Sequence, residues 1–312
     1  MAAKAWSTQQ KAVDEVFFQN EHVSLCLLIN RRTRTMRVID FRAGPSNAKR
    51  MFVMSLAQRE GAEKVYTLVE RDEVSTWVKL GFAKEGNIPG FYKRSDAFML
   101  GAMATGTHRV PAASETRIAI ASDEEAPPAV PEISPAQALM ERTIVLGKKH
   151  AKELVDKPLP LAKVAVMREA DAKKAVEKAL KTGRALSAFE PFGRDVQRSY
   201  YIVTARGGFE LVASTESQAC FGNSFLELLT PPRNDAERLA TVSALRSLCE
   251  RFLADGVVSC FALAPSDDVS LATAFAFNGF RRTGLLQSHL FVGGERKDAI
   301  IWSRKLANPA DE

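Results

Sequence analysis

One order of strands and helices occurs twice along this chain of 312 residues. In the first half, apolar periodicity and β-branched runs predict a hairpin at 24–41, a helix at 46–61, a strand at 64–70, a short helix at 71–82 and two strands within 83–100. In the second half, the same signals predict a strand at 223–229, a helix at 234–256, a strand at 257–264, a short helix at 270–280 and strands at 281–292 and 297–306. Such internal repetition predicts one architecture used twice.

Local motifs recur at equivalent points of the two halves. A proline precedes each long helix, and each short helix ends on Gly-Phe, followed by a basic strand that contains a glycine. The matching residues are Pro45 against Pro231 and Pro232, and Gly81-Phe82 against Gly279-Phe280. We therefore expect an α/β (α+β) fold with two tandem units, each a mixed β-sheet flanked by helices.

Residues 111–135 separate the halves and are rich in Pro, Ala, Ser and acidic residues, with little periodic apolar pattern. This composition is typical of a linker. We expect an N-terminal domain at 1–110, a linker at 111–135 and a C-terminal domain at 136–312. The last of these opens with helices at 133–156 and 168–183 and a strand meander at 199–219.

Composition excludes several classes of protein. An apolar content of 46% is enough for a core in each half, and no long uncharged apolar run predicts a signal peptide or a membrane span. We therefore expect a cytoplasmic protein without a membrane partner. The cysteines lack CxxC spacing, which predicts reduced core residues and no metal site. They are Cys26, Cys220, Cys249 and Cys260.

The net charge of +6 raises the question of a nucleic-acid partner. The densest basic cluster is "NRRTRTMR" at 30–37, between two strand-like runs, which favours the solvated tip of a hairpin. No aromatic residue interleaves these arginines to stack on a base. We do not expect a nucleic-acid partner.

The repeated unit resembles the coenzyme-binding half of the GNAT acetyltransferases. The stretch "GFAKEGNIPGFYKRSDAFMLG" at 81–101 is similar to a segment of the β-lysine N-acetyltransferase family, and weaker similarity in apolar pattern runs over residues 22–306. The resemblance implies a GNAT fold, acetyl-coenzyme A as cofactor and an amine as substrate.

The family holds the coenzyme pyrophosphate on the amides of a Thr-x-Pro-x-x-Arg-Gly-x-Gly turn at a helix start. In "TPPRNDAER", Thr230 and Pro232 match this motif, whereas Asp235 replaces the arginine and Ala236 and Arg238 replace the glycines. A carboxylate and a long side chain then stand where anionic phosphates would bind, which indicates a degenerate cofactor site. The same stretch is also an ordinary helix start, with Asn234 or Asp235 as N-cap and Glu237 in the first turn.

One acidic residue matches a functional position of the family in kind. Glu227 in "FLELL" stands where the family has an aspartate, and an acid there could act as general base toward an ammonium group. The strand pattern leaves open whether Glu227 faces the site or solvent. His289 is the histidine nearest the expected site in the fold and is open to the same two interpretations. Phe261 and Phe280 offer no proton, so we find no general acid.

Two functions follow from these residues. The first is a non-catalytic binding, scaffolding or regulatory protein that needs no cofactor and has another protein as partner. The alternative is an active N-acetyltransferase that takes acetyl-coenzyme A and a small-molecule amine or lysine. For a protein partner, the aromatic and basic stretch Phe91, Tyr92, Lys93 and Arg94 is the candidate surface, unless it packs one repeat against the other.

Overall fold

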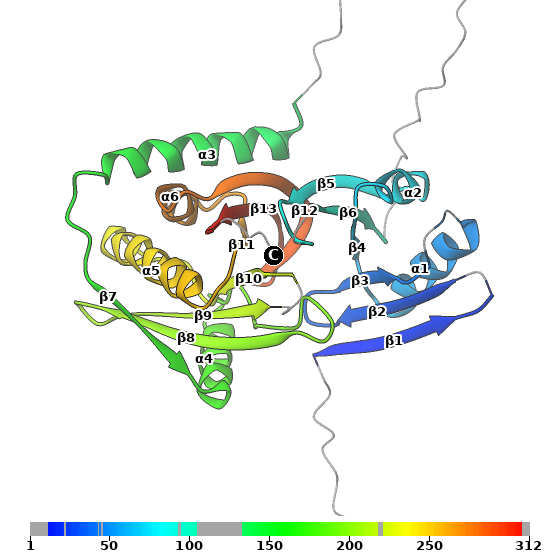
Figure 1. Ribbon diagram of the computed structural model, residues 1–312, viewed down its shortest axis with the longest axis horizontal. Coiled ribbons are helices and arrows are strands. Elements are labelled where there is room, and N and C mark those ends of the chain that lie inside the picture. Colours follow the sequence, from blue (N-terminus) through cyan, green and yellow to red (C-terminus); the bar gives the residue numbers. More distant parts are fainter. Residues whose placement is uncertain are drawn as a thin grey trace, which may run out of the picture.

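The computed structural model describes residues 12–21, 23–42, 44, 46–92, 95–104, 133–217 and 221–307. We call 12–104 the first half and 133–307 the second half. The two halves lie side by side, and their strands form a continuous band through the molecule (Figure 1). Most of the expected linker, from 111 to 132, lies outside the described residues.

The first half contains six strands and two helices within its described residues. They are β1 (Val13–Gln19), β2 (Ser24–Asn30), β3 (Thr35–Asp40), α1 (Asn47–Arg59), β4 (Lys64–Val69), α2 (Val74–Lys79), β5 (Ala83–Ile88) and β6 (Ala97–Met103). β1 was not expected from the sequence. It carries Asp14 and Glu15 and lies at the edge of the sheet, so its residues show no clear strand pattern.

The described part of the second half contains seven strands and four helices. They are α3 (Pro135–Glu153), β7 (Ala162–Met167), α4 (Glu169–Lys181), β8 (Gln197–Ala205), β9 (Phe209–Ser217), β10 (Asn223–Leu228), α5 (Asp235–Ala254), β11 (Ser259–Pro265), α6 (Val269–Phe277), β12 (Arg281–Val292) and β13 (Glu295–Lys305). β7 is the opposite edge strand of the sheet, and the sequence did not predict it either.

The two halves have the same strand order, as the repeated motifs predict. The order is β2-β3-β4-β6-β5 in the first half and β9-β10-β11-β13-β12 in the second. In each half one parallel pair, β3 with β4 or β10 with β11, is joined through a long helix, and the remaining pairs are antiparallel. The expected mixed α/β architecture is therefore present.

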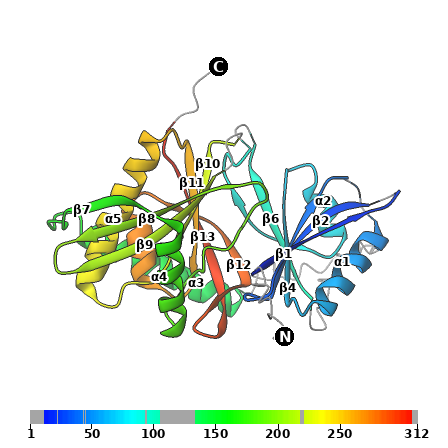
Figure 2. The ribbon, with the colours of Figure 1, turned by 90° about the horizontal axis from the view of Figure 1, so that it is seen from below.

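The two expected sheets are instead one continuous sheet of 13 strands. Its halves join where β5 meets β12 (Figure 1), through the single pair Gly86 and Gly284. The view from below also shows the two halves side by side (Figure 2). A Cβ atom on Gly284 would lie 2.6 Å from the Gly86 Cα, and one on Gly86 would lie 2.7 Å from the Gly284 Cα. Only glycine allows the backbones to come this close, which explains the glycine that follows Gly-Phe in both repeats.

The Gly-Phe motifs end a short helix in the same way in each half. Gly81 and Gly279 end α2 and α6 with φ angles of +83° and +75°, where glycine has no steric cost. The following amides donate back to the helix, from Phe82 to the Trp77 carbonyl at 3.1 Å and from Phe280 to the Phe275 carbonyl at 3.0 Å. Each phenylalanine ring then packs edge-on against that same aromatic residue.

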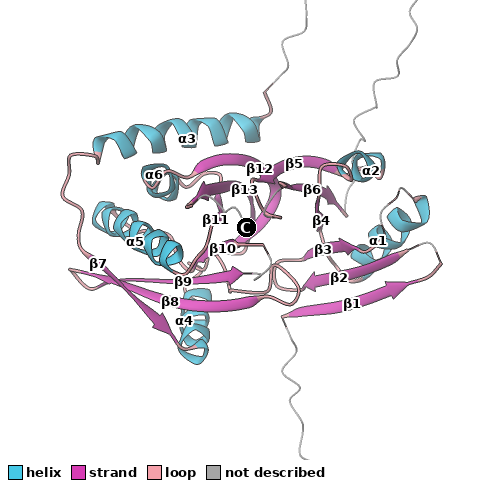
Figure 3. Ribbon diagram, in the orientation of Figure 1, coloured by secondary structure: helices cyan, strands magenta, loops and turns pink. Residues whose placement is uncertain are grey.

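Helices cover the sheet unequally in the second half. α3, α5 and α6 share one apolar core with inward residues of the strands, such as Leu211 and Ala213 of β9. The alternate β9 residue Val212 contacts the cluster on the opposite face, under α4, as a pleated strand requires. α4 lies on the other side of these strands from α5 (Figure 3). A third cluster joins the halves, with Tyr66 and Phe91 from the first and Phe192, Phe225 and Phe261 from the second.

Two further expectations can be compared with the structure. Cys26, Cys249 and Cys260 are buried free thiols, as predicted, and Cys220 lies outside the described residues. The arginine cluster does lie at the β2–β3 turn, where Arg31 and Arg34 are exposed as expected, whereas Arg32 packs on the second half by pairing with Glu190. No helix in the described ranges is long and apolar enough to span a membrane.

Candidate functional site

The parallel strands of each half separate before they end. β10 and β11 pair only as far as Leu226 and Ala262, after which β10 continues along β9 and β11 along β13. β3 and β4 separate in the same way after Val38 and Thr67. Glu227 is the first β10 residue beyond the separation, so the strand geometry places an acidic side chain at this opening.

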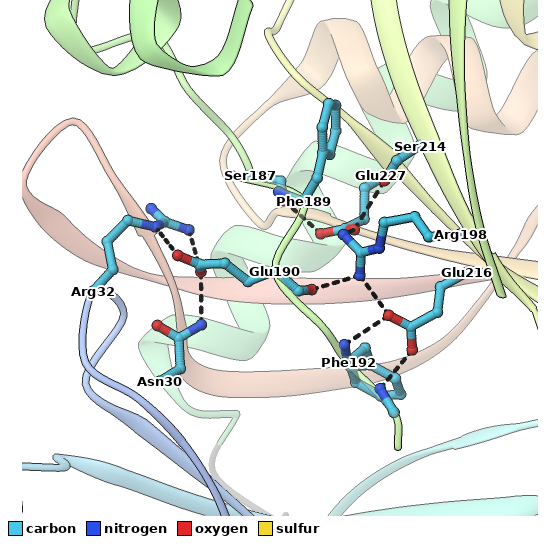
Figure 4. Close-up of polar contacts among 11 residues, drawn as sticks. Asn30, Arg32, Ser187, Phe189, Glu190, Phe192, Arg198, Ser214, Glu216 and Glu227 are labelled. Atoms are coloured by element: carbon cyan, nitrogen blue, oxygen red, sulfur yellow. Dashed lines mark hydrogen bonds and ion pairs between the residues drawn. The ribbon is translucent and has the colours of Figure 1, made fainter. Parts of the chain in front are cut away.

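Glu227 points into the protein, which answers the question that strand periodicity left open. Its carboxylate accepts hydrogen bonds from the hydroxyls of Ser187 and of Ser214, the latter at 3.0 Å, and lies 3.3 Å from the Arg198 guanidinium (Figure 4). Burial raises the pKa of Glu227 to about 7, although Arg198 and Ser187 act in the opposite direction. The group can therefore exchange a proton near neutral pH.

Arg198 links Glu227 to a second buried acid, Glu216 of β9. The guanidinium pairs with Glu216 and also donates to the Glu190 carbonyl at 2.7 Å. Glu216 in turn accepts the amides of Phe192, at 2.8 Å, and of Gly193. These bonds fix the 187–193 segment, between α4 and β8, over the opening of the sheet.

Glu190 connects this segment to the first half. Its carboxylate accepts from Arg32 Nε at 2.7 Å, from Arg32 Nη2 at 2.9 Å and from Asn30 Nδ2 at 2.6 Å. Arg37 adds a hydrogen bond to the Phe192 carbonyl, and its guanidinium lies 4.6 Å from the centre of the Phe192 ring. The opening at Glu227 is thus walled by both halves.

The resulting cavity, which we call the seam cleft, has a volume of about 90 Å³. Glu227, Ser187 and Glu190 line it from the second half, and Tyr66 and Arg32 from the first. Its apolar lining consists of Leu186, Pro191, Phe192, Phe225, Leu228, Leu263, Leu290 and Phe291. The cleft is therefore a small site whose lining combines apolar walls with several polar groups.

His289 and Tyr66 also line the seam cleft, and both are buried. Their rings pack edge to face with centroids 4.7 Å apart. Burial lowers the pKa of His289 to about 3, with Lys64 and Arg296 acting in the same direction, so its imidazole is neutral. Burial raises the pKa of Tyr66 to about 12, so the phenol keeps its proton.

The expected cofactor turn is held by its own side chains. Asn234 is the N-cap of α5 and accepts the Glu237 amide at 2.9 Å, while the Glu237 carboxylate accepts the Arg233 amide at 2.7 Å. Pro231 and Pro232 have no N–H group. Arg184 donates to the Pro231 carbonyl at 2.8 Å.

The four residues expected at the phosphates lie around this helix start without forming a cradle. Asp235 and Ala236 are exposed, Thr230 is half-buried, and Arg238 turns back to pair with Asp235 at 3.1 Å. A pyrophosphate would meet the carboxylates of Asp235 and Glu237 there.

The expected partner surface lies partly inside the molecule. Phe91 is buried, its ring lies 5.5 Å from that of Phe221 and 6.1 Å from that of Phe261, and the Tyr92 ring lies 5.3 Å from that of Phe221. These contacts correspond to the alternative in which the stretch packs one repeat on the other. Lys93 and Arg94 lie outside the described residues.

Most of the groups around Glu227 were not expected from the sequence. Ser187 and Glu190 belong to an irregular segment that carries no motif, and Tyr66 lies in the other half of the chain. Arg198 and Glu216 did carry a signal, since a charged residue at each end of an apolar meander is unusual unless the two are paired.

In the described ranges, no group of His, Cys, Asp or Glu is arranged to hold a metal ion.

No family model matches the chain, and no curated protein matches it in sequence. About half of the chain is structurally similar to solved GNAT N-acetyltransferases. The ribosomal-protein-S18-alanine N-acetyltransferase from Escherichia coli matches 49% of this chain and 98% of its own, with a TM-score of 0.35 and 14% identity. The spermidine N-acetyltransferase from Vibrio cholerae, in complex with CoA and spermine, matches 47% and 96%, with a TM-score of 0.38 and 8% identity.

Proposed function

We propose that this acetyltransferase-like protein no longer uses coenzyme A and acts by binding, as a non-catalytic regulatory or scaffolding protein. The observation that carries this proposal is the closed start of α5. Two amides of this turn, those of Arg233 and Glu237, are bonded to Glu237 and Asn234 of the same turn, and the Arg238 amide donates to the Asn234 carbonyl.

Electrostatics at the turn support the same conclusion. The carboxylate of Glu237 already occupies the positive end of the α5 dipole, and Asp235 adds a second negative charge there. Two like charges about 4 Å apart repel by about 1 kcal/mol in bulk water and by more near a protein surface. A ligand with several phosphate charges meets this repulsion more than once.

Calorimetric titration with coenzyme A and acetyl-coenzyme A tests the proposal. We expect dissociation constants weaker than about 1 mM, because two amides of the turn already donate to its own side chains and its arginines Arg233 and Arg238 are paired with Glu237 and Asp235. A variant with Asp235→Arg, Ala236→Gly, Glu237→Ala and Arg238→Gly frees the helix start and should gain measurable affinity. Micromolar binding by the unaltered protein would refute the proposal.

A matched control separates the turn from general effects of charge and flexibility. Glu169→Arg with Ala170→Gly makes the same kinds of change at the exposed start of α4. This variant should bind coenzyme A no better than the unaltered protein. If it gains as much affinity as the α5 variant, nonspecific charge explains the result.

A second candidate function is an active N-acetyltransferase, and one observation favours it. Glu227 has a pKa raised to about 7, as a general base requires, and the Tyr66 phenol lines the same cleft as a possible proton donor. Release of free thiol from acetyl-coenzyme A in the presence of a small amine would support this function. A protein partner and a small-molecule amine both remain predictions.

A further inference from the structure

The inner wall of the seam cleft contains a buried polar atom with no partner. His289 is 7% exposed, and its Nδ1 makes no hydrogen bond to any described residue. Tyr66, also 7% exposed, packs against it edge to face and lines the same cleft. Buried polar groups in folded proteins are nearly always paired, so an unpaired one beside a cavity indicates a group that binds there.

The cavity is larger than a single water site. Its volume is about 90 Å³, whereas about 10–15 Å³ on the same kind of measure is enough for one water molecule. Phe192, Phe225 and Leu263 form apolar walls on which water cannot make hydrogen bonds. The cavity therefore fits a body of a few carbon atoms that carries a polar end.

The charged groups of the cleft already compensate one another. Arg32 neutralises Glu190, Arg198 neutralises Glu216, and below about pH 7 burial keeps Glu227 protonated and uncharged. Behind His289, Lys64 pairs with Glu85 and Arg296 pairs with Glu63. An ammonium or carboxylate ligand would enter the cleft without an unpaired counter-charge, and burying such a charge is costly.

Neutral hydrogen-bonding groups remain to recognise a ligand. The His289 imidazole carries no charge, and one of its ring nitrogens donates a hydrogen bond while the other accepts one. The Tyr66 hydroxyl can donate to a carbonyl oxygen. A primary amide offers both complementary groups, a carbonyl acceptor and an N–H donor.

We propose that the seam cleft binds a small uncharged amide, or the amide end of a larger molecule, through Tyr66 and His289. This inference rests on the proposed binding function, since it assigns the ligand class to the cleft. It does not depend on the state of the α5 turn. The polar end of the ligand contacts Tyr66 and His289, and its apolar part contacts the phenylalanine walls.

Three probes of nearly equal size test the ligand class: propionamide, propionate and propylamine. The chain has four histidines, so the imidazole signals in an NMR spectrum are few, and a His289→Gln variant identifies that of His289. We expect propionamide to shift the His289 signal saturably at millimolar concentration, and the two charged probes to bind at least about fivefold more weakly.

Two tyrosine variants locate the contact. Tyr66→Phe removes one hydroxyl from the cleft and should weaken propionamide binding about threefold to tenfold, the usual effect of one lost hydrogen bond. Tyr201→Phe is the matched control, because Tyr201 is equally buried but packs on Phe252 in the core under α5. It should leave the affinity unchanged.

Several results would overturn the inference. Tighter binding of propylamine would make the cleft an ammonium site, and tighter binding of propionate would make it an anion site. No shift of the His289 signal with any probe would leave the imidazole as a packed core residue. Coenzyme A titrated into the same sample tests the α5 turn separately, so failure of the proposed function is distinguishable from failure of the amide site.

Discussion

At the residue scale, Glu227 shows how burial and pairing compete. Its side chain is only 9% exposed, and this burial favours the protonated form, while Arg198 and two serine hydroxyls favour the ionised form. Burial is the larger effect, so the folded state holds a proton on Glu227 more tightly than the unfolded chain does. A group of this kind makes stability depend on pH.

Glu227→Gln should remove that dependence. Below about pH 4.5 the side chain is protonated in both states, and as the pH rises toward about 7 only the unfolded chain releases its proton. The stability of the unaltered protein should therefore fall relative to that of the variant by about 2–3 kcal/mol across this window. Urea unfolding of both proteins at pH 5 and pH 8 measures the difference.

The effect of Glu227 must be measured as a difference between the two proteins, because His289 makes stability rise with pH whereas Glu227 makes it fall. The folded pKa of His289 is lowered to about 3, so its contribution to stability is present above about pH 6.5 and is lost as the pH falls. This contribution is common to both proteins and cancels in the difference. An unchanged difference between pH 5 and pH 8 would mean that Glu227 is ionised in the folded protein at both values.

At the element scale, the start of α5 is a capped helix. Asn234 accepts the Glu237 amide, and Glu237 accepts the Arg233 amide in return. The sequence left two interpretations of this turn open, a degenerate cofactor site and an ordinary helix start. The hydrogen bonds identify Asn234 rather than Asp235 as the N-cap.

Asn234→Ala should destabilise the protein by about 1 kcal/mol, the usual cost of losing an N-cap side chain. Asp235→Ala is the control, because the Asp235 side chain is 86% exposed and pairs only with its neighbour Arg238 in the described ranges. Its effect should stay within about 0.5 kcal/mol. Equal effects of the two changes in urea unfolding would contradict the assignment of the cap.

The crossing of β5 and β12 depends on two glycines. Gly284→Ala should destabilise the protein by about 2 kcal/mol or more, because the new methyl group overlaps the backbone of the facing strand. Gln287→Ala changes an exposed position on the same strand and should have little effect. Thermal unfolding of both variants checks this, and a Gly284→Ala protein as stable as the control would show that the strands can move apart without cost.

At the scale of the whole molecule, the halves share one sheet and one aromatic cluster. Phe91 of the first half packs on Phe261 of the second, and Arg296 of β13 pairs with Glu63 and donates to the Thr33 carbonyl at 2.7 Å. The tandem order that the sequence predicts therefore builds a single body rather than two independent ones. The domain boundaries at 110 and 135 remain predictions.

A cut in the chain between residues 111 and 130 tests the strength of this seam. We expect an engineered protease site there to yield two fragments that still elute together, because the shared sheet and the buried aromatic cluster hold them. Size-exclusion chromatography after cleavage measures this. Separate elution of the fragments would show that the connecting segment, and not the seam, keeps the halves together.

Apolar periodicity and turn residues were enough to determine the repeated order of helices and strands along the chain, the long helices and the Gly-Phe helix ends. These features depend on neighbours within a few residues. The edge strands β1 and β7, the joining of two sheets at Gly86 and Gly284, and the seam cleft were decided only in the tertiary structure. Glu227 was found from the sequence, but its pKa depends on Arg198, Ser187 and Ser214, which lie 13 to 40 residues away along the chain. No local pattern specifies such contacts, since they form only when distant segments pack together.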